Sequence, residues 1–204
     1  DKRIKDIEII VLCDVNNKLL GPEGAAAMFG PQKGASPEEI RILNSGLLRF
    51  SEMIFRHNGK KISDLKYGGP AGGAAAGLGG LLNATLVNGA DYFLQVTGFE
   101  AELKNFDLLI TGEGSIDDQS LQGKGPVRAA HLAKKNGLVV IGLAGKVPLH
   151  SSNELSKYFD IILAIGDKPS SMSEAIAHTR FNLSRMSTEI GNLLYMLIHK
   201  LIKN

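Results

Sequence analysis

The strongest constraint on the fold is a strand–helix–strand pattern in the second half of the chain. Apolar runs of strand length cover Leu108 to Ile110 and Leu138 to Leu143, and a helical segment from Pro126 to Asn136 precedes the second run. Gly137 follows that segment at the position where helices commonly end in a left-handed residue. Residues Thr111 to Gly125 are expected to form a loop. Two strands joined through a helix pair in parallel with a right-handed crossover, so the sequence predicts an α/β protein.

Further strands and a helix are expected outside this unit. Ile9 to Cys13 is a continuous apolar run, typical of a strand buried on both faces, and Asp160 to Ile165 repeats the signal. Ser36-Pro37-Glu38-Glu39 supplies an N-cap, a proline at the first helical position and a glutamate three residues after the cap. A helix should therefore start at Pro37 and end at His57-Asn58-Gly59.

The C-terminal region predicts one long amphipathic helix. Ser171 and Glu174 form a second capping box at its start. Its inward side chains are expected to be Ile176, Met186, Ile190, Leu193, Leu197 and Leu201. Two short helices are expected earlier in the chain, at residues 90–96 and 100–104.

Composition excludes several classes of function. The 23 basic and 21 acidic side chains give a net charge of +2, too small for a broad field that attracts nucleic acid or an anionic membrane. Tryptophan is absent and aromatic residues make up 6%, which leaves few platforms for stacking bases. No apolar run approaches the roughly 18 residues of a membrane span, and no signal peptide is visible. We expect no nucleic-acid or membrane partner.

The single cysteine and the first residue bear on location and completeness. Cys13 cannot build a disulfide framework, which fits a reducing compartment, so we expect a cytoplasmic protein. Its place in a buried strand indicates a small core residue rather than a nucleophile. Residue 1 is aspartate rather than methionine, which is compatible with a fragment.

Glycine is over-represented: it makes up 24 of 204 residues, about 12%, whereas its typical usage is about 7%. Seven of these glycines lie within Gly68–Gly80, whose sequence is GGPAGGAAAGLGG. One interpretation is a loop and helix start whose backbone N–H groups approach a phosphate closely. The other is tight helix packing that only glycine and alanine permit. Composition leaves both open.

Polar residues follow the first three predicted strands in chain order, at the edge where parallel sheets bind ligands. The first strand is followed by Asp14-Val15-Asn16, the second by Thr111-Gly112-Glu113-Gly114-Ser115-Ile116-Asp117, and the third by Ala144-Gly145-Lys146. Carboxylates, glycines and hydroxyl or amide groups suit phosphate oxygens and a hard cation such as Mg²⁺. The alternative for Glu113 and Asp117 is a solvated turn with helix caps.

Two common nucleotide-binding signatures are absent. The pattern G-x-x-x-x-G-K-[ST] fails because Gly123-Lys124 is followed by Gly125, with Asp118 at the position of the first glycine. The pattern G-x-G-x-x-G fails because Gly112 and Gly114 lead to Asp117. A P-loop protein and the usual NAD-dependent enzyme are therefore disfavoured.

Several longer motifs, taken in order, resemble the bacterial glycerate kinase family. They are Cys13-Asp14-Val15-Asn16-Asn17, Leu20-Gly21-Pro22-Glu23-Gly24-Ala25-Ala26-Ala27, Phe29-Gly30-Pro31-Gln32-Lys33-Gly34-Ala35, Ile110-Thr111-Gly112-Glu113-Gly114-Ser115-Ile116-Asp117, Gly123-Lys124-Gly125-Pro126 and Ile141-Gly142-Leu143-Ala144-Gly145. The resemblance covers essentially the whole chain. Departures include Ser115, where the family commonly has arginine.

The resemblance implies ATP-dependent phosphorylation of D-glycerate with Mg²⁺ as cofactor. It also implies a Rossmann-like, parallel, three-layer α/β/α portion plus part of a second, inserted α/β domain. Residues 1–88 would belong to the inserted domain and residues 89–204 to the Rossmann-like one. By this comparison the chain is the C-terminal half of a longer enzyme and is inactive alone. A homo-oligomer is possible.

The site residues implied by the resemblance fall into a catalytic, a metal-binding and a substrate- or nucleotide-binding group. Asp14 and Asp117 are candidates to orient or deprotonate the glycerate hydroxyl, with Lys124 neutralising charge and Glu113 a candidate Mg²⁺ ligand. The candidate substrate- and nucleotide-binding residues are Asn16, Gln32, Lys33, Gly72, Gly73, Gly77, Gly79, Thr111, Gly112 and Gly114. The alternative function is a small-molecule-binding or regulatory domain that keeps the fold without the chemistry.

Overall fold

The computed structural model describes residues 1–150 and 152–202, and these residues divide into two compact units. Unit 1 comprises Asp1–Glu102 and Leu121–Arg128. Unit 2 comprises Leu103–Ser120 and the residues from Ala129 onward. The assignment of residues 1–88 to an inserted domain and 89–204 to a Rossmann-like domain stays a prediction. Within the described ranges, no helix is both long and apolar enough to cross a bilayer.

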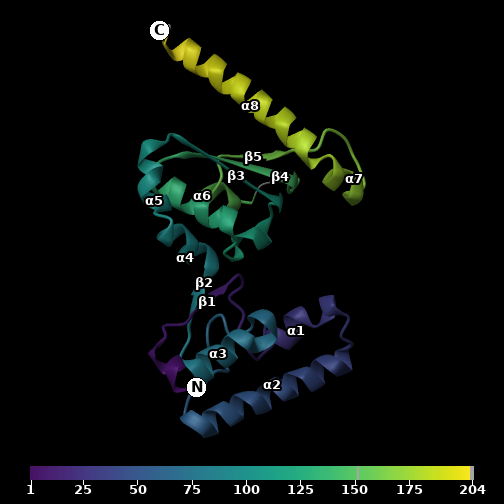
Figure 1. Cartoon of the computed structure of the whole chain (residues 1–204). Helices are drawn as coiled ribbons and strands as arrows, with labels where there is room; N and C mark the ends of the chain where they lie inside the picture. The colour runs from purple at the N-terminus through teal and green to yellow at the C-terminus, as the bar shows by residue number, and fades with distance from the viewer. Residues whose placement is uncertain (151, 203–204) are drawn as a thin grey trace. The chain divides into compact units, whose positions relative to one another are not determined.

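Unit 1 is built on a two-stranded parallel sheet flanked by helices (Figure 1). Its elements are η1 (Lys2–Asp6), β1 (Ile10–Cys13), α1 (Ala25–Phe29), η2 (Pro31–Lys33), α2 (Pro37–Asn58), η3 (Pro70–Gly73), α3 (Ala74–Leu82), β2 (Thr85–Asn88), α4 (Gly89–Val96) and α5 (Phe99–Glu102). Strands β1 and β2 pair from Ile10 with Thr85 to Cys13 with Asn88.

This sheet differs from the sequence-based expectation in two respects. Strand β2 was not expected, because its four residues carry too short an apolar signal. The expectation that the first strand is buried on both faces is wrong, since the Leu12 side chain is 54% exposed. Both faces of a parallel strand are buried only where helices cover them, and the face of β1 that carries Leu12 lacks such a cover within unit 1.

Helix α2 confirms the prediction from its capping sequence. The Ser36 hydroxyl accepts a hydrogen bond from the Glu39 backbone N–H, while the Glu39 carboxylate accepts one from the Ser36 N–H at 2.8 Å. Gly59 ends the helix at φ +75°, a left-handed conformation that glycine adopts without strain. The start and end are therefore both set by local residues.

The core of unit 1 depends on a close approach between α2 and α3. Leu19, Ile54, Ile62 and Ala76 form its buried centre. A Cβ atom added to Gly80 on α3 would lie 3.0 Å from Cγ2 of Ile54 on α2 and 2.7 Å from Cγ2 of Ile62, both inside van der Waals contact. Part of the glycine-rich run is thus required by helix packing, as one of the two interpretations expected.

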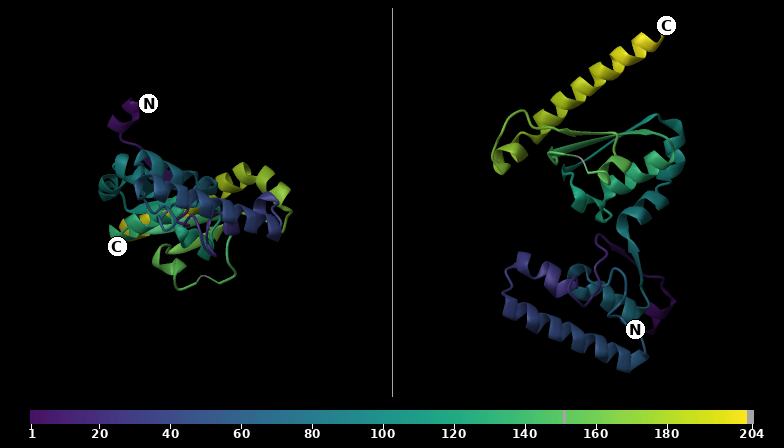
Figure 2. Two further views of the ribbon diagram at one scale, coloured as in Figure 1. Left: turned by 90° about the horizontal axis from the view of Figure 1, so that it is seen from below. Right: turned by 180° about the vertical axis from the view of Figure 1, so that it is seen from behind.

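Unit 2 contains a three-stranded parallel sheet in the order β3-β4-β5. Its elements are η4 (Leu103–Asn105), β3 (Leu108–Ser115), η5 (Asp118–Gln122, which runs into unit 1), α6 (Gly125–Lys135, which starts in unit 1), β4 (Val139–Lys146), η6 (Leu155–Lys157), β5 (Ile161–Ala164), α7 (Met172–Ala177) and α8 (Thr179–Ile202). Figures 1 and 2 show α6 and α8 on opposite faces of this sheet. The predicted parallel α/β architecture is confirmed.

The expected loop from Thr111 to Gly125 is wrong over its first five residues, which continue strand β3 to Ser115. Glycines weaken a strand in isolation, but β4 runs alongside and pairs with this segment as far as Ser115 with Lys146. A Cβ on Gly112 would lie 2.6 Å from the carbonyl oxygen of Leu143. The glycine is therefore the residue that lets β3 approach β4 at this point.

The single long C-terminal helix is also wrong, because α7 and α8 are separated at His178. Ile190 is buried and Met186 packs on the same core, as expected. The expected inward side chains of Ile176, Leu193 and Leu197 are instead 66%, 50% and 49% exposed. Only the middle of α8, at Met186, Ile190 and Leu194, packs on the core of the sheet. The Leu201 side chain lies outside the described set.

Candidate functional site

The carboxyl end of the two-stranded sheet in unit 1 gathers polar residues from distant parts of the sequence. Asp14 and Asn16 follow β1 and are exposed. Asn88 ends β2 and pairs in register with Cys13, directly beside Asp14. Its side-chain Oδ1 accepts a hydrogen bond from the Asp91 N–H at 2.9 Å, which caps helix α4. Asn88 was not among the predicted site residues.

The segment that carries Lys124 reaches the same end of this sheet. Gly123 has φ +102°, and a Cβ added there would lie 3.1 Å from Nδ2 of Asn88. The Arg128 guanidinium forms an ion pair with the Asp91 carboxylate, which ties the start of α6 to α4. The fold thus brings the neighbourhoods of Asp14 and Lys124 together through Asn88.

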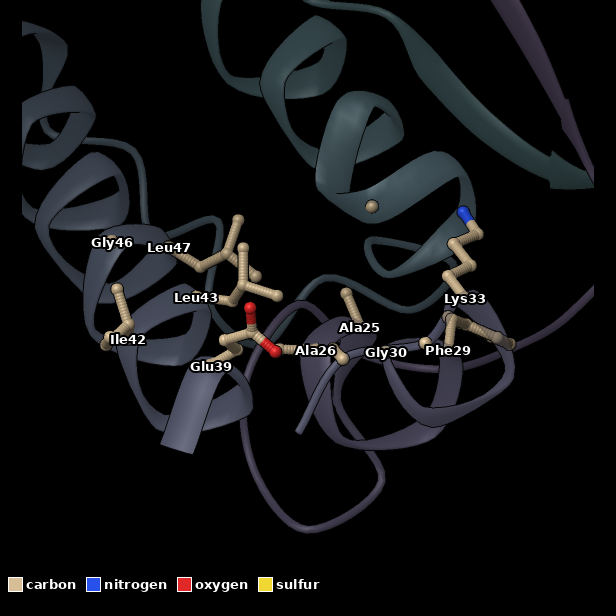
Figure 3. Close-up of a pocket in the computed structure, with 13 residues that line it drawn as sticks. Ala25, Ala26, Phe29, Gly30, Lys33, Glu39, Ile42, Leu43, Gly46 and Leu47 are labelled. Atoms are coloured by element: carbon tan, nitrogen blue, oxygen red, sulfur yellow. The ribbon is translucent and has the colours of Figure 1, made fainter. Parts of the chain in front are cut away.

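Lys33 and Gly72 line a pocket of about 790 Å³ inside unit 1. Helices α1 and α2, the η2 turn and η3 form its walls, and most of the lining side chains are apolar. Figure 3 shows Lys33 and Phe29 at one end of the pocket and Ile42 and Gly46 at the other. Gln32 is exposed beside Lys33, but it is not a lining residue.

The four predicted glycines of the GGPAGGAAAGLGG run have different surroundings. Gly72 has φ +69°, and an added Cβ would meet nothing within 4 Å, so its backbone faces open space at the pocket. An added Cβ would lie 2.5 Å from Leu19 Cδ1 at Gly73, 3.2 Å from Phe50 Cζ at Gly77 and 3.4 Å from Leu65 Cδ1 at Gly79. Packing accounts for Gly73 and Gly77, and a ligand role for these glycines stays a prediction.

The predicted residues of unit 2 lie on β3 and in the turn after it. Thr111, Gly112, Glu113 and Gly114 are strand residues, and Glu113 pairs in register with Ala144. The Ser115 hydroxyl donates a hydrogen bond to Asp117 Oδ2 at 3.1 Å, and the Asp117 N–H donates one to the buried hydroxyl of Ser120. These contacts hold Asp117 in an ordered turn at the carboxyl end of the sheet.

Mg²⁺ would have to be held by few protein ligands. Among the described residues, no group of three or more histidine, cysteine, aspartate or glutamate side chains could hold a metal ion. Mg²⁺ commonly binds one or two carboxylates together with water and substrate phosphates. Unit 2 has two such carboxylates, Glu113 and Asp117, which would supply one or two ligands. One carboxylate oxygen of Glu113 is directed into the protein.

Cys13 has the properties of a core residue, as expected. It is 1% exposed, and burial raises the pKa of its thiol, with a further increase from the Asp14 carboxylate. A raised pKa disfavours the thiolate, which is the nucleophilic form. The structure therefore assigns no chemistry to this cysteine.

A sequence model of the glycerate kinase family matches residues 1–195. The chain belongs to this family. It is 44% identical to a glycerate kinase of Halalkalibacterium halodurans over 147 residues, covering 72% of this chain and 39% of that protein. It is 36% identical to the glycerate 2-kinase of Escherichia coli K12 over 198 residues, covering 95% of this chain and 51% of that protein.

A solved structure agrees with this membership. A crystal structure from Salmonella typhimurium LT2, provisionally assigned as glycerate kinase 2, matches with a TM-score of 0.71 and 36% identity, covering 96% of this chain and 50% of that one. The resemblance inferred from the motifs is thus confirmed for the family and the fold. The chain spans about half the length of most relatives that it matches.

Proposed function

We propose that this chain is part of a kinase that transfers the γ-phosphoryl group of ATP to a hydroxyl group of D-glycerate. The observation that carries the proposal is the family match over residues 1–195, together with relatives named glycerate kinase that align with nearly the whole chain. The reaction yields ADP, a phosphoglycerate and the proton of the hydroxyl. We further propose a cytoplasmic protein that binds neither nucleic acid nor membrane.

Phosphoryl transfer requires positioning and charge neutralisation more than covalent chemistry by the protein. Asp14, exposed at the end of β1, has the chemistry to accept the hydroxyl proton or to orient the hydroxyl. Lys124 follows the glycine that contacts Asn88 and would neutralise charge at the same end of the sheet. Gly72 and Lys33 in the pocket of unit 1 supply a backbone and a cation suited to an anion.

Unit 2 supplies a second set of candidate groups, on β3 and in the turn after it. Glu113 would hold Mg²⁺, which when bound would neutralise charge on the phosphates. Asp117 is the alternative to Asp14 as the group that orients the glycerate hydroxyl, and its bond to Ser115 fixes its side chain. The domain assignment, with residues 1–88 in an inserted domain and 89–204 in a Rossmann-like one, completes the proposal.

The test is a coupled assay of ADP formation on the gene product that carries this sequence and on the 204-residue chain. We expect ADP release that depends on D-glycerate and Mg²⁺ in the gene product, and none in the 204-residue chain alone. Binding of ATP and glycerate without ADP release in the gene product would favour the alternative of a regulatory domain. ADP release that does not depend on glycerate would contradict the proposed substrate.

A further inference from the structure

The side chains that line the pocket of unit 1 limit the kinds of ligand that it can bind. Its volume of about 790 Å³ falls within the usual range for sites that hold drug-sized ligands. Ile42 and Leu43 on α2 are 63% and 49% exposed and present apolar surface to the opening. Phe29 on α1 adds an aromatic ring at the other end (Figure 3). Such walls suit a flat apolar ring system.

The two charges in the pocket are separated along its length. Figure 3 shows the Glu39 carboxylate in the middle and the Lys33 ammonium at one end. Glu39 is held in place because its Oε2 accepts hydrogen bonds from the backbone N–H and the hydroxyl of Ser36, both at 2.8 Å. These bonds keep the pKa of the Glu39 carboxyl below its usual range, so it stays negatively charged near pH 7.

Glycerate does not match this arrangement. It carries a carboxylate and two hydroxyl groups on three carbon atoms, so it has no apolar surface to set against Phe29, Ile42 and Leu43. Its polar groups would lose water without gaining partners on those walls. Its carboxylate would also be repelled by Glu39 wherever it lay in the middle of the pocket.

We infer that this pocket binds the purine nucleoside of ATP, with the phosphates at the Lys33 end and with glycerate bound elsewhere. The base would pack against the apolar side chains of α1 and α2, and its exocyclic amine would donate to the Glu39 carboxylate. The phosphates would lie away from Glu39, beside Lys33 and the open backbone at Gly72. This inference rests on the proposed function for the identity of the nucleotide.

A matched pair of glycine substitutions tests the inference. Gly46 and Gly191 both lie inside long helices, and a Cβ added to either meets nothing within 4 Å. Gly46 lines the pocket, whereas Gly191 lies in unit 2. Gly46→Leu therefore fills the pocket, and Gly191→Leu makes the same chemical change away from it. The probe is a fluorescent N-methylanthraniloyl ATP, titrated into the 204-residue chain, with thermal unfolding of each variant as the folding control.

We expect Gly46→Leu to weaken binding of the fluorescent ATP at least tenfold and Gly191→Leu to change it less than twofold. An excess of D-glycerate should not displace the probe, whereas unlabelled ATP should. In Lys33→Met, ATP should compete more weakly while adenosine competes as in the wild type. This second variant changes an exposed side chain, so it keeps the test sound even where Gly46→Leu lowers stability.

The inference is overturned by equal binding to Gly46→Leu and wild type, by displacement with glycerate, or by a wild-type chain that does not bind the probe. It fails separately from the proposed function. If the Gly46→Leu gene product phosphorylates glycerate with an unchanged KM for ATP, the proposed function stands and the assignment of ATP to this pocket is wrong. If ATP binding depends on the pocket but glycerate is not phosphorylated, the assignment of the pocket stands and the proposed function is wrong.

Discussion

Asn88 links three segments at the carboxyl end of the small sheet. Its backbone pairs with β1 beside Asp14, its Oδ1 caps α4 through the Asp91 N–H, and its amide lies against Gly123. Asp14 and Lys124 were predicted from the sequence, but Asn88 was missed. The only local signal was an N-cap asparagine before Gly-Ala-Asp, because the other two contacts depend on strand register and on a loop 35 residues away.

Substitution of Asn88 should separate its capping role from its contact with the Lys124 segment. Asn88→Ala removes the cap and is expected to cost about 1 kcal/mol in free energy of unfolding, measured by urea denaturation. Asn88→Asp keeps a capping oxygen, so most of that loss should be restored. An equal loss in both variants would show that the Oδ1 bond to Asp91 does not contribute to stability.

At the scale of single elements, glycines inside helices differ in what surrounds them. An added Cβ at Gly80 in α3 would press on the fully buried Ile62, whereas one at Gly46 in α2 would meet open space. Gly80→Ala should therefore lower the free energy of unfolding by about 1–3 kcal/mol. Gly46→Ala should raise it by about 0.5–1 kcal/mol, because alanine favours the helix. Urea denaturation of the two variants would contradict the account if both changes had the same sign.

Asp160 connects the elements of unit 2 and makes its stability depend on pH. Its carboxylate accepts hydrogen bonds from Lys134 Nζ on α6 at 2.6 Å and from the Val140 N–H on β4 at 2.8 Å. These partners, Lys134 first, lower its pKa from 3.8. The stabilisation is therefore present above about pH 4 and is lost as the pH falls through the lowered pKa.

The comparison of wild type with Asp160→Asn checks this sign. Wild type should be the more stable at pH 7, and the difference in unfolding midpoint should shrink steadily below pH 4. A difference that stays constant between pH 7 and pH 2.5 would mean that the charge of Asp160 does not contribute. Chemical denaturation of both proteins at each pH measures this difference in unfolding midpoint.

Local signals predicted the elements that local residues control. Helix α2 was correct from cap to cap because Ser36, Glu39 and Gly59 set its ends. Strand β3 was predicted five residues too short and β2 was missed, because glycine-rich or very short strands owe their existence to a partner strand. The break at His178 was missed since the capping box at Ser171 predicts where a helix starts, not where it ends.

At the scale of the whole molecule, the division into two units joins segments that are distant in the chain. Leu121–Arg128 belongs with Asp1–Glu102, partly through the ion pair between Arg128 and Asp91. No local pattern in the sequence reports such an association. The family could nevertheless be inferred from ordered motifs, because residues such as Asp14, Lys33 and Lys124 occur within distinctive runs rather than alone.

The central claim is tested most directly by following the γ-phosphoryl group itself. The gene product carrying this sequence is incubated with γ-³²P-labelled ATP, Mg²⁺ and D-glycerate, and the labelled products are separated. We predict labelled phosphoglycerate, with its rate reduced about 100-fold or more in whichever of Asp14→Asn and Asp117→Asn removes the proton acceptor. Label that stays in ATP or appears only as inorganic phosphate, from a folded protein that binds ATP, would contradict a glycerate kinase.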